Sequence, residues 1–488
     1  MTNWRPKIDS LMASTSSVTG HAGPVMRLAV SPDDRFFVSG SFDSTCRIWE
    51  LGKIDASDGL LESSTTYTGH AENSSSPAVR VNDVAIVENS HSVVSAASDG
   101  SVHVWRVDLV SSTPNASSHQ HNQQHQQQRA HHSGSTQDYH GNAGHGVASG
   151  MPIAFQSSKV SGSTTIRRVD AKEGEALAVS HYNTLSQSVV AYATQKGVVH
   201  TWDLRAQKEP FKLVHQPAIG YLTAMSLGHD RNWLLTGTSD GFLALWDVRF
   251  GRMVKLWNTD TTLPINRLAT KYAGFASRGL GPRPFAFVSS GADCGMYDLA
   301  DGVCRQSFRI LDPHHDEFGS PVSRMKLPEL HEVRVAADRT RYARDRKAEL
   351  ARSGTRPSRS VASVNAMLGV MGHEQPFLVT GSSDAHLRFW DFSLPGKCYT
   401  ISGQTSGQPR PVYERMDFQR SNRLMVCRQG ASPRLSDVES SRLPRRLQRG
   451  MVRAENRHSD SIQDLKIIQA PVPALASCSR DGSINLWR

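Results

Sequence analysis

The sequence predicts an all-β protein, a seven-bladed β-propeller, and three observations carry this prediction. An apolar segment, a turn rich in Ser, Gly and Asp, and a second segment ending in an aromatic residue recur along the 488 residues. In five of the repeats an Asp precedes a Trp by six positions. Trp202 and Trp246 stand 44 residues apart, the length of one four-stranded blade. The seven copies occupy residues 38–50, 94–106, 191–203, 235–247, 288–298, 379–391 and 476–488.

The residue types within a repeat follow from the needs of one blade. Alternating apolar positions, such as Leu243 and Leu245, indicate strands buried between neighbouring blades. The Asp-Gly or Ser-Asp pair favours a tight hairpin between the second and third strands, because these residues tolerate positive φ. The regular order of strand, turn and strand is typical of a WD-repeat propeller.

In that propeller family the turn Asp is tied to a His at the blade entrance, a strand Ser or Thr, and the Trp indole. The candidate sets are His21 with Asp43 and Trp49, His70 with Asp99 and Trp105, His215 with Asp240 and Trp246, His458 with Asp481 and Trp487, and Asp384 with Trp390, for which no His is assigned. Breaking one link leaves buried polar groups unsatisfied at a cost of about 1–3 kcal/mol. We interpret these residues as structural and not as catalytic.

We expect one propeller over residues 1–488 with three long insertions, because three spacings between marker aromatics exceed 90 residues. Residues 109–165 hold a Gln- and His-rich tract that predicts disorder, and its unspaced His residues do not predict a metal site. Residues 324–360 are basic, with a helix expected over 331–352, which lacks Gly and Pro. Residues 403–457 are rich in Pro, Ser and Arg and are expected to be irregular. Since no strand-turn-strand signature occurs in these gaps, hidden blades are not expected.

The ring is expected to close through its two ends. Arg488 follows the last marker Trp directly, so the seventh blade lacks its outermost strand within its own repeat. We expect an N-terminal strand, near Leu11–Ala13, to supply it and so remove an exposed sheet edge.

The net charge of +10 is concentrated in two insertions. Residues 324–360 hold eleven Lys and Arg against five Asp and Glu, and residues 428–457 hold eight Arg against three acids. The remaining chain is nearly neutral, which disfavours a nucleic-acid-binding ring. The insertions are either solvated arms or segments that meet an acidic partner or an anionic membrane surface.

The sequence disfavours a membrane or secreted protein, and it also disfavours an enzyme. It has no 18-residue apolar run and no N-terminal signal pattern, and its six Cys are scattered, which favours a cytoplasmic protein with reduced thiols. Gly237-Thr238-Ser239-Asp240-Gly241 matches a hydrolase nucleophile motif, but it lies in a strand-to-strand turn and not in a strand-to-helix turn. We therefore expect no enzyme activity, no catalytic residues and no cofactor.

Longer stretches extend the interpretation to a particular family. SVVAYATQKGVVHTWDLR (188–205), WLLTGTSDGFLALWDVRFG (233–251) and FLVTGSSDAHLRFWDFSLPGKCYTISG (377–403) resemble the C-terminal WD-repeat domain of the regulatory, protein-kinase-like subunit of class III phosphatidylinositol 3-kinase. The resemblance runs nearly end to end outside the insertions. Family members carry a kinase-like domain and helical repeats before this propeller, and neither is expected in this chain.

The resemblance implies a scaffold. The expected partners are the catalytic subunit of class III phosphatidylinositol 3-kinase and beclin-type coiled-coil subunits, with autophagy and endosomal or vacuolar sorting as the setting. The expected location is cytoplasmic and peripheral on endosomal and autophagic membranes, with a possible role for anionic lipid at the basic insertions.

One alternative comes from a different class of protein. Trp202-Asp203-Leu204-Arg205 and Trp246-Asp247-Val248-Arg249 are WDxR boxes in consecutive blades, as in substrate receptors of cullin-type ubiquitin ligases. In those receptors the Arg contacts the adaptor, so Arg205 and Arg249 are the candidate contacts. The structural interpretation is that Asp and Arg simply end the strand.

Overall fold

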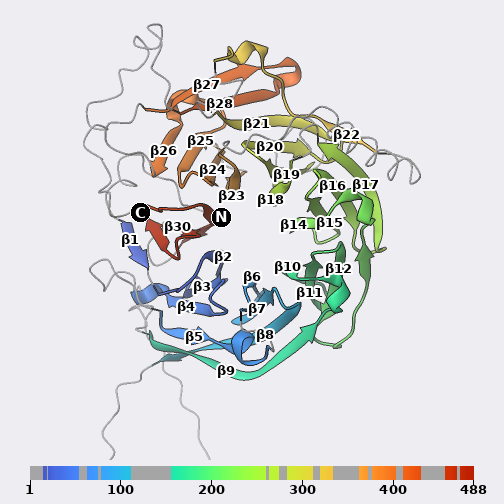
Figure 1. Ribbon diagram of the computed structural model, residues 1–488, viewed down its shortest axis with the longest axis vertical. Helices are drawn as coiled ribbons and strands as arrows, with labels where there is room; N and C mark the ends of the chain where they lie inside the picture. The colour runs from blue at the N-terminus through green and yellow to red at the C-terminus, as the bar shows by residue number, and fades with distance from the viewer. Residues whose placement is uncertain are drawn as a thin grey trace, which may run out of the picture.

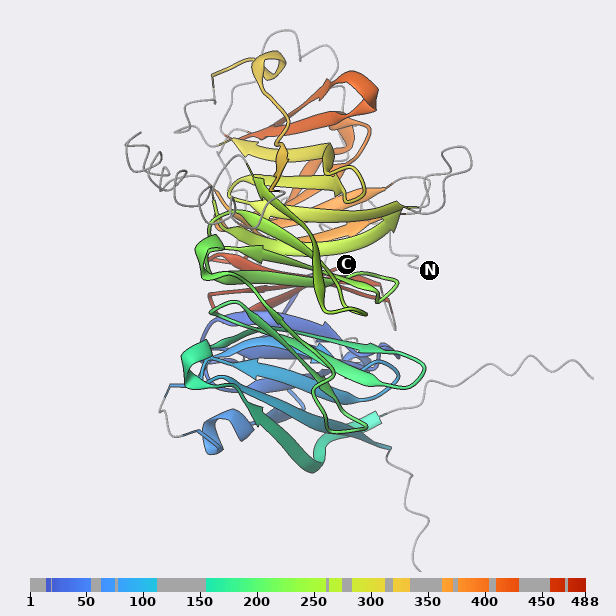
Figure 2. The same ribbon diagram turned by 90° about the vertical axis from the view of Figure 1, so that its right-hand side faces the viewer.

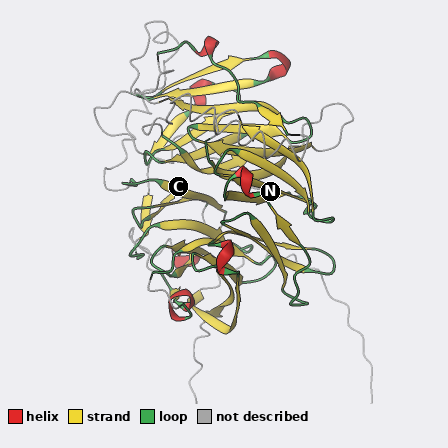
Figure 3. Cartoon of the chain, turned by 45° about the vertical axis from the view of Figure 1, so that its right-hand side comes forward, coloured by secondary structure: helices red, strands yellow, loops and turns green. Residues whose placement is uncertain are grey.

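Seven sheets form a closed ring around a central channel in the computed structural model (Figure 1). The structure describes residues 15–18, 20–53, 63–74, 78–111, 155–259, 263–273, 283–311, 319–333, 362–371, 376–402, 410–429, 457–469 and 473–488. Strands dominate this part of the chain, and its helical turns are short (Figure 3). These turns are η1 (Leu51–Lys53), α1 (Gly69–Glu72), η2 (Ala171–Glu173), η3 (Pro217–Ile219), η4 (Val322–Arg324), η5 (Pro395–Lys397) and η6 (Gln419–Ser421). The predicted seven-bladed, all-β fold is confirmed.

Each blade has four antiparallel strands running from the channel to the rim, and blades 1 to 3 follow the order of the chain. Blade 1 holds β2 (Val25–Val30), β3 (Phe36–Ser41), β4 (Cys46–Glu50) and β5 (Thr65–Tyr67). Blade 2 holds β6 (Val81–Ile86), β7 (Ser92–Ala97), β8 (Ser101–Ser111) and β9 (Phe155–Arg168). Blade 3 holds β10 (Ala176–Asn183), β11 (Ser188–Thr194), β12 (Val198–Asp203) and β13 (Lys212–Val214).

Blades 4 to 6 continue this order. Blade 4 holds β14 (Leu222–Leu227), β15 (Trp233–Thr238), β16 (Phe242–Asp247) and β17 (Arg252–Thr259). Blade 5 holds β18 (Ile265–Ala273), β19 (Arg283–Ser290), β20 (Asp293–Asp298) and β21 (Val303–Leu311). Blade 6 holds β23 (Val364–Val370), β24 (Phe377–Ser382), β25 (Leu387–Asp391) and β26 (Tyr399–Ser402).

Blade 7 closes the ring by joining the two ends of the described chain. It holds β29 (Ile462–Ile468), β30 (Ala474–Ser479) and β31 (Ile484–Trp487), and its outermost strand is β1 (Thr15–Val18). Thr15 pairs with Trp487 and Val18 with Ile484 in an antiparallel register. Closure by an N-terminal strand is thus confirmed, although the strand is Thr15–Val18 and the expected Leu11–Ala13 lies outside the described residues.

The innermost strand of every blade carries a β-bulge near its start. The register shifts fall between Val25/Arg27, Val81/Asp83, Ala176/Ala178, Leu222/Ala224, Ile265/Arg267, Val364/Ala366 and Ile462/Asp464. A bulge bends its strand and re-aims the side chains around it. In this ring the repeated bulge sets which side chains face the channel.

Two strand segments return to a blade that the chain has already completed. After blade 5, β22 (Leu330–Glu332) goes back to pair with β17 of blade 4. After blade 6, the hairpin of β27 (Val412–Asp417) and β28 (Arg423–Arg428) goes back to blade 5, where β28 lies parallel to β21. This hairpin projects beyond the ring at the rim of blade 5 (Figures 1 and 2).

Parts of the insertions are therefore ordered strands, against the expectation. The segment 403–457 is not irregular throughout, because β27 and β28 lie within it. The helix expected over 331–352 does not begin at 331, where β22 is a strand, and residues 334–361 lie outside the described residues. The 109–165 insertion separates β8 from β9 inside blade 2, and its flanks lengthen these two strands, which pair from Ser101/Arg168 out to Ser111/Phe155.

Candidate interaction surface

The blade 1 polar set forms a continuous hydrogen-bonded chain. The Trp49 indole donates to Ser39 Oγ at 2.8 Å, and Ser39 Oγ lies 2.7 Å from His21 Nε2. His21 Nδ1 lies 2.8 Å from Asp43 Oδ2. Burial alone raises the pKa of the Asp43 carboxyl, but the hydrogen bond and charge of His21, with a bond from Thr45, hold that pKa well below its usual range. All of these polar groups form their hydrogen bonds inside the blade.

Blades 2 and 7 insert a serine into the same chain. His70 Nε2 contacts Ser95 Oγ at 2.7 Å, while Ser101 stands between His70 and Asp99, donating to the carboxylate at 2.6 Å. In blade 7, His458 Nε2 contacts Ser477, and Ser483 bridges His458 Nδ1 to Asp481. The indoles of Trp105 and Trp487 donate to Ser95 and Ser477.

Blades 4 and 6 depart further from the expected set. Thr236 accepts from Trp246 and contacts His215, but Asp240 accepts from the Ser239 hydroxyl and does not reach His215 by a hydrogen bond.

In blade 6, Trp390 donates to Thr380, and a buried Arg388 takes the place of the His. Its guanidinium donates to Ser382 at 2.9 Å and pairs with Asp384. Sequence reasoning missed Arg388, although an Arg two residues before the marker Trp in an apolar strand was a usable signal.

A second buried histidine lies against His70 at the boundary between blades 1 and 2. The rings of His70 and His103 stack with centroids 3.8 Å apart, and Tyr67 Oη lies 2.9 Å from His103 Nδ1. Burial lowers the pKa of His70 to about 3 and that of His103 to about 4. Both imidazoles are therefore neutral at pH 7.

Four charged side chains meet inside the channel from bulges of four different blades. Arg27 of β2 faces Asp83 of β6 at 3.5 Å, and Arg267 of β18 pairs with Asp464 of β29 at 2.7 Å. The carboxylates also accept main-chain N–H groups, Asp83 from Val179 and Asp464 from Leu28. The Arg267–Asp464 pair joins blades 5 and 7, which are not neighbours, and the other contacts join neighbouring blades. The signal in the sequence was an apolar residue, one spacer and a charge at the start of the first strand.

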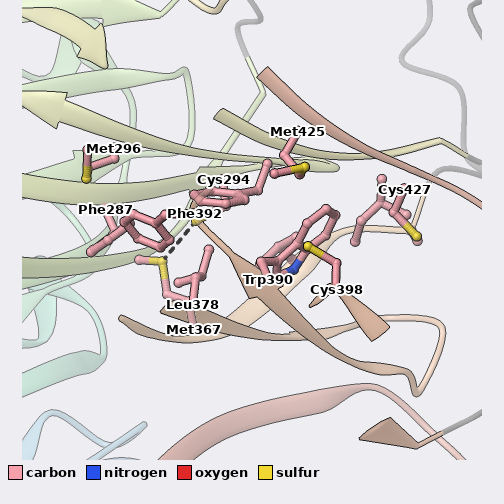
Figure 4. Close-up of a cluster of buried hydrophobic side chains, with 14 of the residues drawn as sticks. Phe287, Cys294, Met296, Met367, Leu378, Trp390, Phe392, Cys398, Met425 and Cys427 are labelled. Atoms are coloured by element: carbon pink, nitrogen blue, oxygen red, sulfur yellow. Dashed lines mark hydrogen bonds between the residues drawn. The ribbon is translucent and has the colours of Figure 1, made fainter. Parts of the chain in front are cut away.

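The β27–β28 hairpin shares its core with blades 5 and 6. Met425 and Cys427 of β28 are fully buried in one cluster with Phe287, Phe308 and Trp390 (Figure 4). The Tyr413 ring meets the Trp390 ring edge-on, with centroids 5.4 Å apart. The hairpin is thus an integral part of the propeller and places a rigid sheet edge at the rim.

The two candidate adaptor contacts lie on equivalent turns of blades 3 and 4 and are both exposed. The Arg249 guanidinium holds Asp247 with two bonds, of 3.1 Å and 2.6 Å. The Arg205 main-chain N–H donates to Asp203 at 3.0 Å. The Asp of each box therefore closes its own turn, as the structural interpretation expects, and the Arg side chains lie at the surface.

The hydrolase-like motif lies in a hairpin turn of blade 4. Ser239 of the hydrolase-like motif lies in the β15–β16 turn and accepts the main-chain N–H of Tyr221. Among the residues that the structure covers, no group of His, Cys, Asp and Glu side chains is arranged to hold a metal ion. The six Cys are unpaired and buried, which raises the thiol pKa values. The His-rich tract of the first insertion lies outside the described residues.

Within the described ranges, no helix has both the length and the apolar character needed to cross a bilayer.

Comparisons with known proteins agree with the architecture. The family described as WD domain, G-beta repeat matches residues 12–50, 61–106 and 212–247. The chain is 25% identical over 473 residues to the serine/threonine-protein kinase VPS15 of Arabidopsis thaliana, covering 96% of this chain and 28% of that protein. It is 24% identical over 491 residues to the putative serine/threonine-protein kinase VPS15 of Komagataella pastoris, covering 97% and 30%.

A third relative matches a shorter stretch at higher identity. The probable serine/threonine-protein kinase vps15 of Dictyostelium discoideum is 29% identical over 308 residues, covering 63% of this chain and 13% of that protein. The chain spans less than a third of the length of these curated relatives, and no kinase domain is evident among its described residues. The chain is a seven-bladed WD-repeat propeller that is similar, over nearly its whole length, to the WD domain of VPS15.

Proposed function

We propose that this chain is a non-catalytic scaffold that helps to assemble a class III phosphatidylinositol 3-kinase complex. The observation that carries the proposal is the similarity to VPS15 proteins along 96% of the chain. The geometry supports a scaffold, because the blade polar sets, the channel charges and the hairpin core all rigidify the ring. Rigid surfaces lower the entropic cost of binding partners.

The proposed partners are the lipid-kinase catalytic subunit and beclin-type coiled-coil subunits, in autophagy and endosomal or vacuolar sorting. The rim of blades 4 and 5 is the part of the ring that is enlarged by β22 and the β27–β28 hairpin, and it offers additional ordered surface. We place the chain in the cytoplasm, peripheral to endosomal and autophagic membranes. The basic insertions would add about 1 kcal/mol of attraction per Lys or Arg near an anionic surface.

Affinity purification of the tagged 488-residue chain from its own cells, followed by mass spectrometry, tests the proposal. Recovery of the lipid-kinase catalytic subunit and a beclin-type subunit is the expected result. Recovery of neither, with the propeller shown to be folded, would overturn it. Flotation with vesicles of varied phosphatidylserine content tests the membrane part, which fails if chains lacking 334–361 and 430–456 bind as the whole chain does.

A cullin-type substrate receptor is the second candidate, and the exposure of Arg205 and Arg249 on equivalent turns favours it. The double variant Arg205→Ala/Arg249→Ala separates the two functions. Loss of a co-purifying propeller adaptor and cullin would support the receptor. Unchanged recovery of the lipid-kinase subunits, with no cullin in the wild-type sample, would support the scaffold.

A further inference from the structure

The channel opens into a cavity of about 600 Å³ on the face where the first strand of each blade begins. Its walls come from the starts of the innermost strands of blades 1, 4, 5, 6 and 7 and from the adjacent second turns. They are contributed mainly by polar side chains, among them Asn266, Asn365, Ser461 and Gln463. The volume lies in the range of ligand-binding pockets.

The wall is held rigid by amides at the bulge positions. Asn266 Nδ2 donates to Val364 O at 3.3 Å, and Asn365 Nδ2 donates to Ser461 Oγ at 2.8 Å, so each amide reaches the next blade. Gln463 Nε2 also donates to Ser461 Oγ, at 2.9 Å. A wall of fixed side chains suits selective binding, because little order has to be gained when a ligand enters.

The charged side chains of the channel adjoin the cavity. Arg267 and Asp464 follow Asn266 and Gln463 by one residue, and they pair across the channel. Arg27 lines the cavity and faces Asp83 at 3.5 Å. A ligand in this cavity therefore meets Arg27.

The Arg27 guanidinium is only partly satisfied, because Nη1 donates to Met26 O and Gln463 O but Nε donates to none of the described groups. Its buried Nε has no hydrogen-bond partner within the described residues, and the distance to Asp83 is long for an ion pair. Burial and the charge of Arg267 lower the pKa of Arg27 more than Asp83 and Asp464 raise it. A carboxylate beside Arg27 would offer its guanidinium a further charged acceptor.

The mouth of the cavity is also positive. Arg480 stands exposed on the rim, and no carboxylate in the described part of the chain pairs with its guanidinium. Asp460 is the one acidic residue in the lining that the structure describes. In the sequence, residues 334–361 hold nine Lys and Arg against three acids, and residues 430–456 hold six Arg against three. These segments rejoin the described chain at Ala362 and Arg457, close in sequence to the lining residues Ser363 and Asp460.

We propose that the channel mouth binds an acidic segment of a partner protein and takes one Asp or Glu side chain toward Arg27, with Arg480 contacting the segment at the rim. A peptide fits better than a membrane, because the site is a cavity of about 600 Å³ lined by residues of five blades. The proposal goes beyond the scaffold role. Peptide binding is measured on the isolated chain, whereas complex assembly is measured with the partner subunits, so either proposal can fail without the other.

Fluorescence anisotropy with two labelled nine-residue peptides tests this inference. One carries Asp-Glu-Asp at its centre and the other Asn-Gln-Asn, both flanked by Ala and Gly. The acidic peptide is expected to bind the 488-residue chain at least tenfold more tightly, and less tightly as salt rises. Equal binding of the two peptides, or no binding of either, would overturn the inference.

Variants then place the binding at the mouth. Arg480→Glu should weaken the acidic peptide at least tenfold, whereas the matched exposed control Arg205→Glu should have less than a twofold effect. Thr223→Phe, which fills the cavity from blade 4, should also abolish binding while the thermal melt shows a folded ring. Binding that survives both Arg480→Glu and Thr223→Phe would exclude the cavity. Binding of phosphatidylserine vesicles that Arg480→Glu abolishes, with no binding of the acidic peptide, would assign the site to lipid and contradict the proposal.

Discussion

Arg267 and Asp464 form an ion pair of 2.7 Å although blade 6 separates their blades along the ring. Only a side chain that crosses the channel can make this contact. Asp464 also receives the Leu28 N–H of blade 1, so one carboxylate joins blades 1, 5 and 7. Charged side chains therefore link the blades to one another inside the channel.

Removing one partner of this pair is expected to destabilise the ring strongly. Arg267→Met should lower the free energy of unfolding by about 3–5 kcal/mol, because it leaves the buried Asp464 carboxylate with the distant Lys466, at 3.9 Å, as its remaining ion-pair partner among the described residues. The double variant Arg267→Met/Asp464→Asn should lose less than the sum of the two single variants. Guanidinium unfolding followed by Trp fluorescence measures this, and strict additivity would show that the two residues are not coupled.

The hairpin is expected to contribute as a core element. Met425→Ala should cost about 2–5 kcal/mol, because it opens a cavity beside Trp390. Leu394→Ala is the matched control, since Leu394 is 48% exposed, and it should change stability by less than about 0.5 kcal/mol. Similar unfolding curves for the two variants would mean that the hairpin is not packed as described.

Deletions test the closure by β1. Removal of residues 1–20 should lower the melting temperature and promote association, because it exposes the edge of β31. Removal of residues 1–14, which leaves Thr15–Val18 in place, should have little effect on the melting temperature or on association. Calorimetry with light scattering distinguishes the two cases, and equal melting of both deletions would argue against closure.

Acid is expected to loosen the boundary between blades 1 and 2. The folded pKa values of His70 and His103, about 3 and about 4, lie below the ordinary value of 6.5. The unfolded chain therefore binds more protons between these values, and stability falls as the pH drops from 6.5 towards 4. Asp99 favours the charged form of both imidazoles and Arg168 disfavours it, while His103 also disfavours a charged His70.

Replacement of one imidazole checks the origin of this slope. His103→Gln should flatten the dependence of unfolding free energy on pH between 6.5 and 4.5. His229→Gln, at an exposed position, should leave it unchanged. A slope that both variants share with the wild type would place the responsible groups elsewhere.

The seven blades and their closure could be predicted because each repeat encodes its own strands, turn and marker aromatic. The turn after the Asp shows why: Gly100, Gly241 and Gly482 all adopt positive φ there. The position of the β27–β28 hairpin could not be predicted. β28 pairs in parallel with β21, which lies more than a hundred residues earlier in the chain, and no local pattern specifies that pairing. The polar sets differed between blades for a similar reason, since a Ser can bridge the His to the Asp, as in blades 2 and 7, and Arg388 can pair with the turn Asp in blade 6.

The return of β28 to blade 5 has a consequence for the order in which the chain can fold. Blade 5 cannot complete its buried cluster when its own four strands have been synthesised, because Met425 and Cys427 arrive only after blade 6. The apolar surface of newly synthesised blade 5 would thus stay exposed until β28 is made. Blades 5 and 6 should therefore fold together as one cooperative unit. If translation paused between blade 5 and β28, this apolar surface would be exposed and available for chaperones to bind.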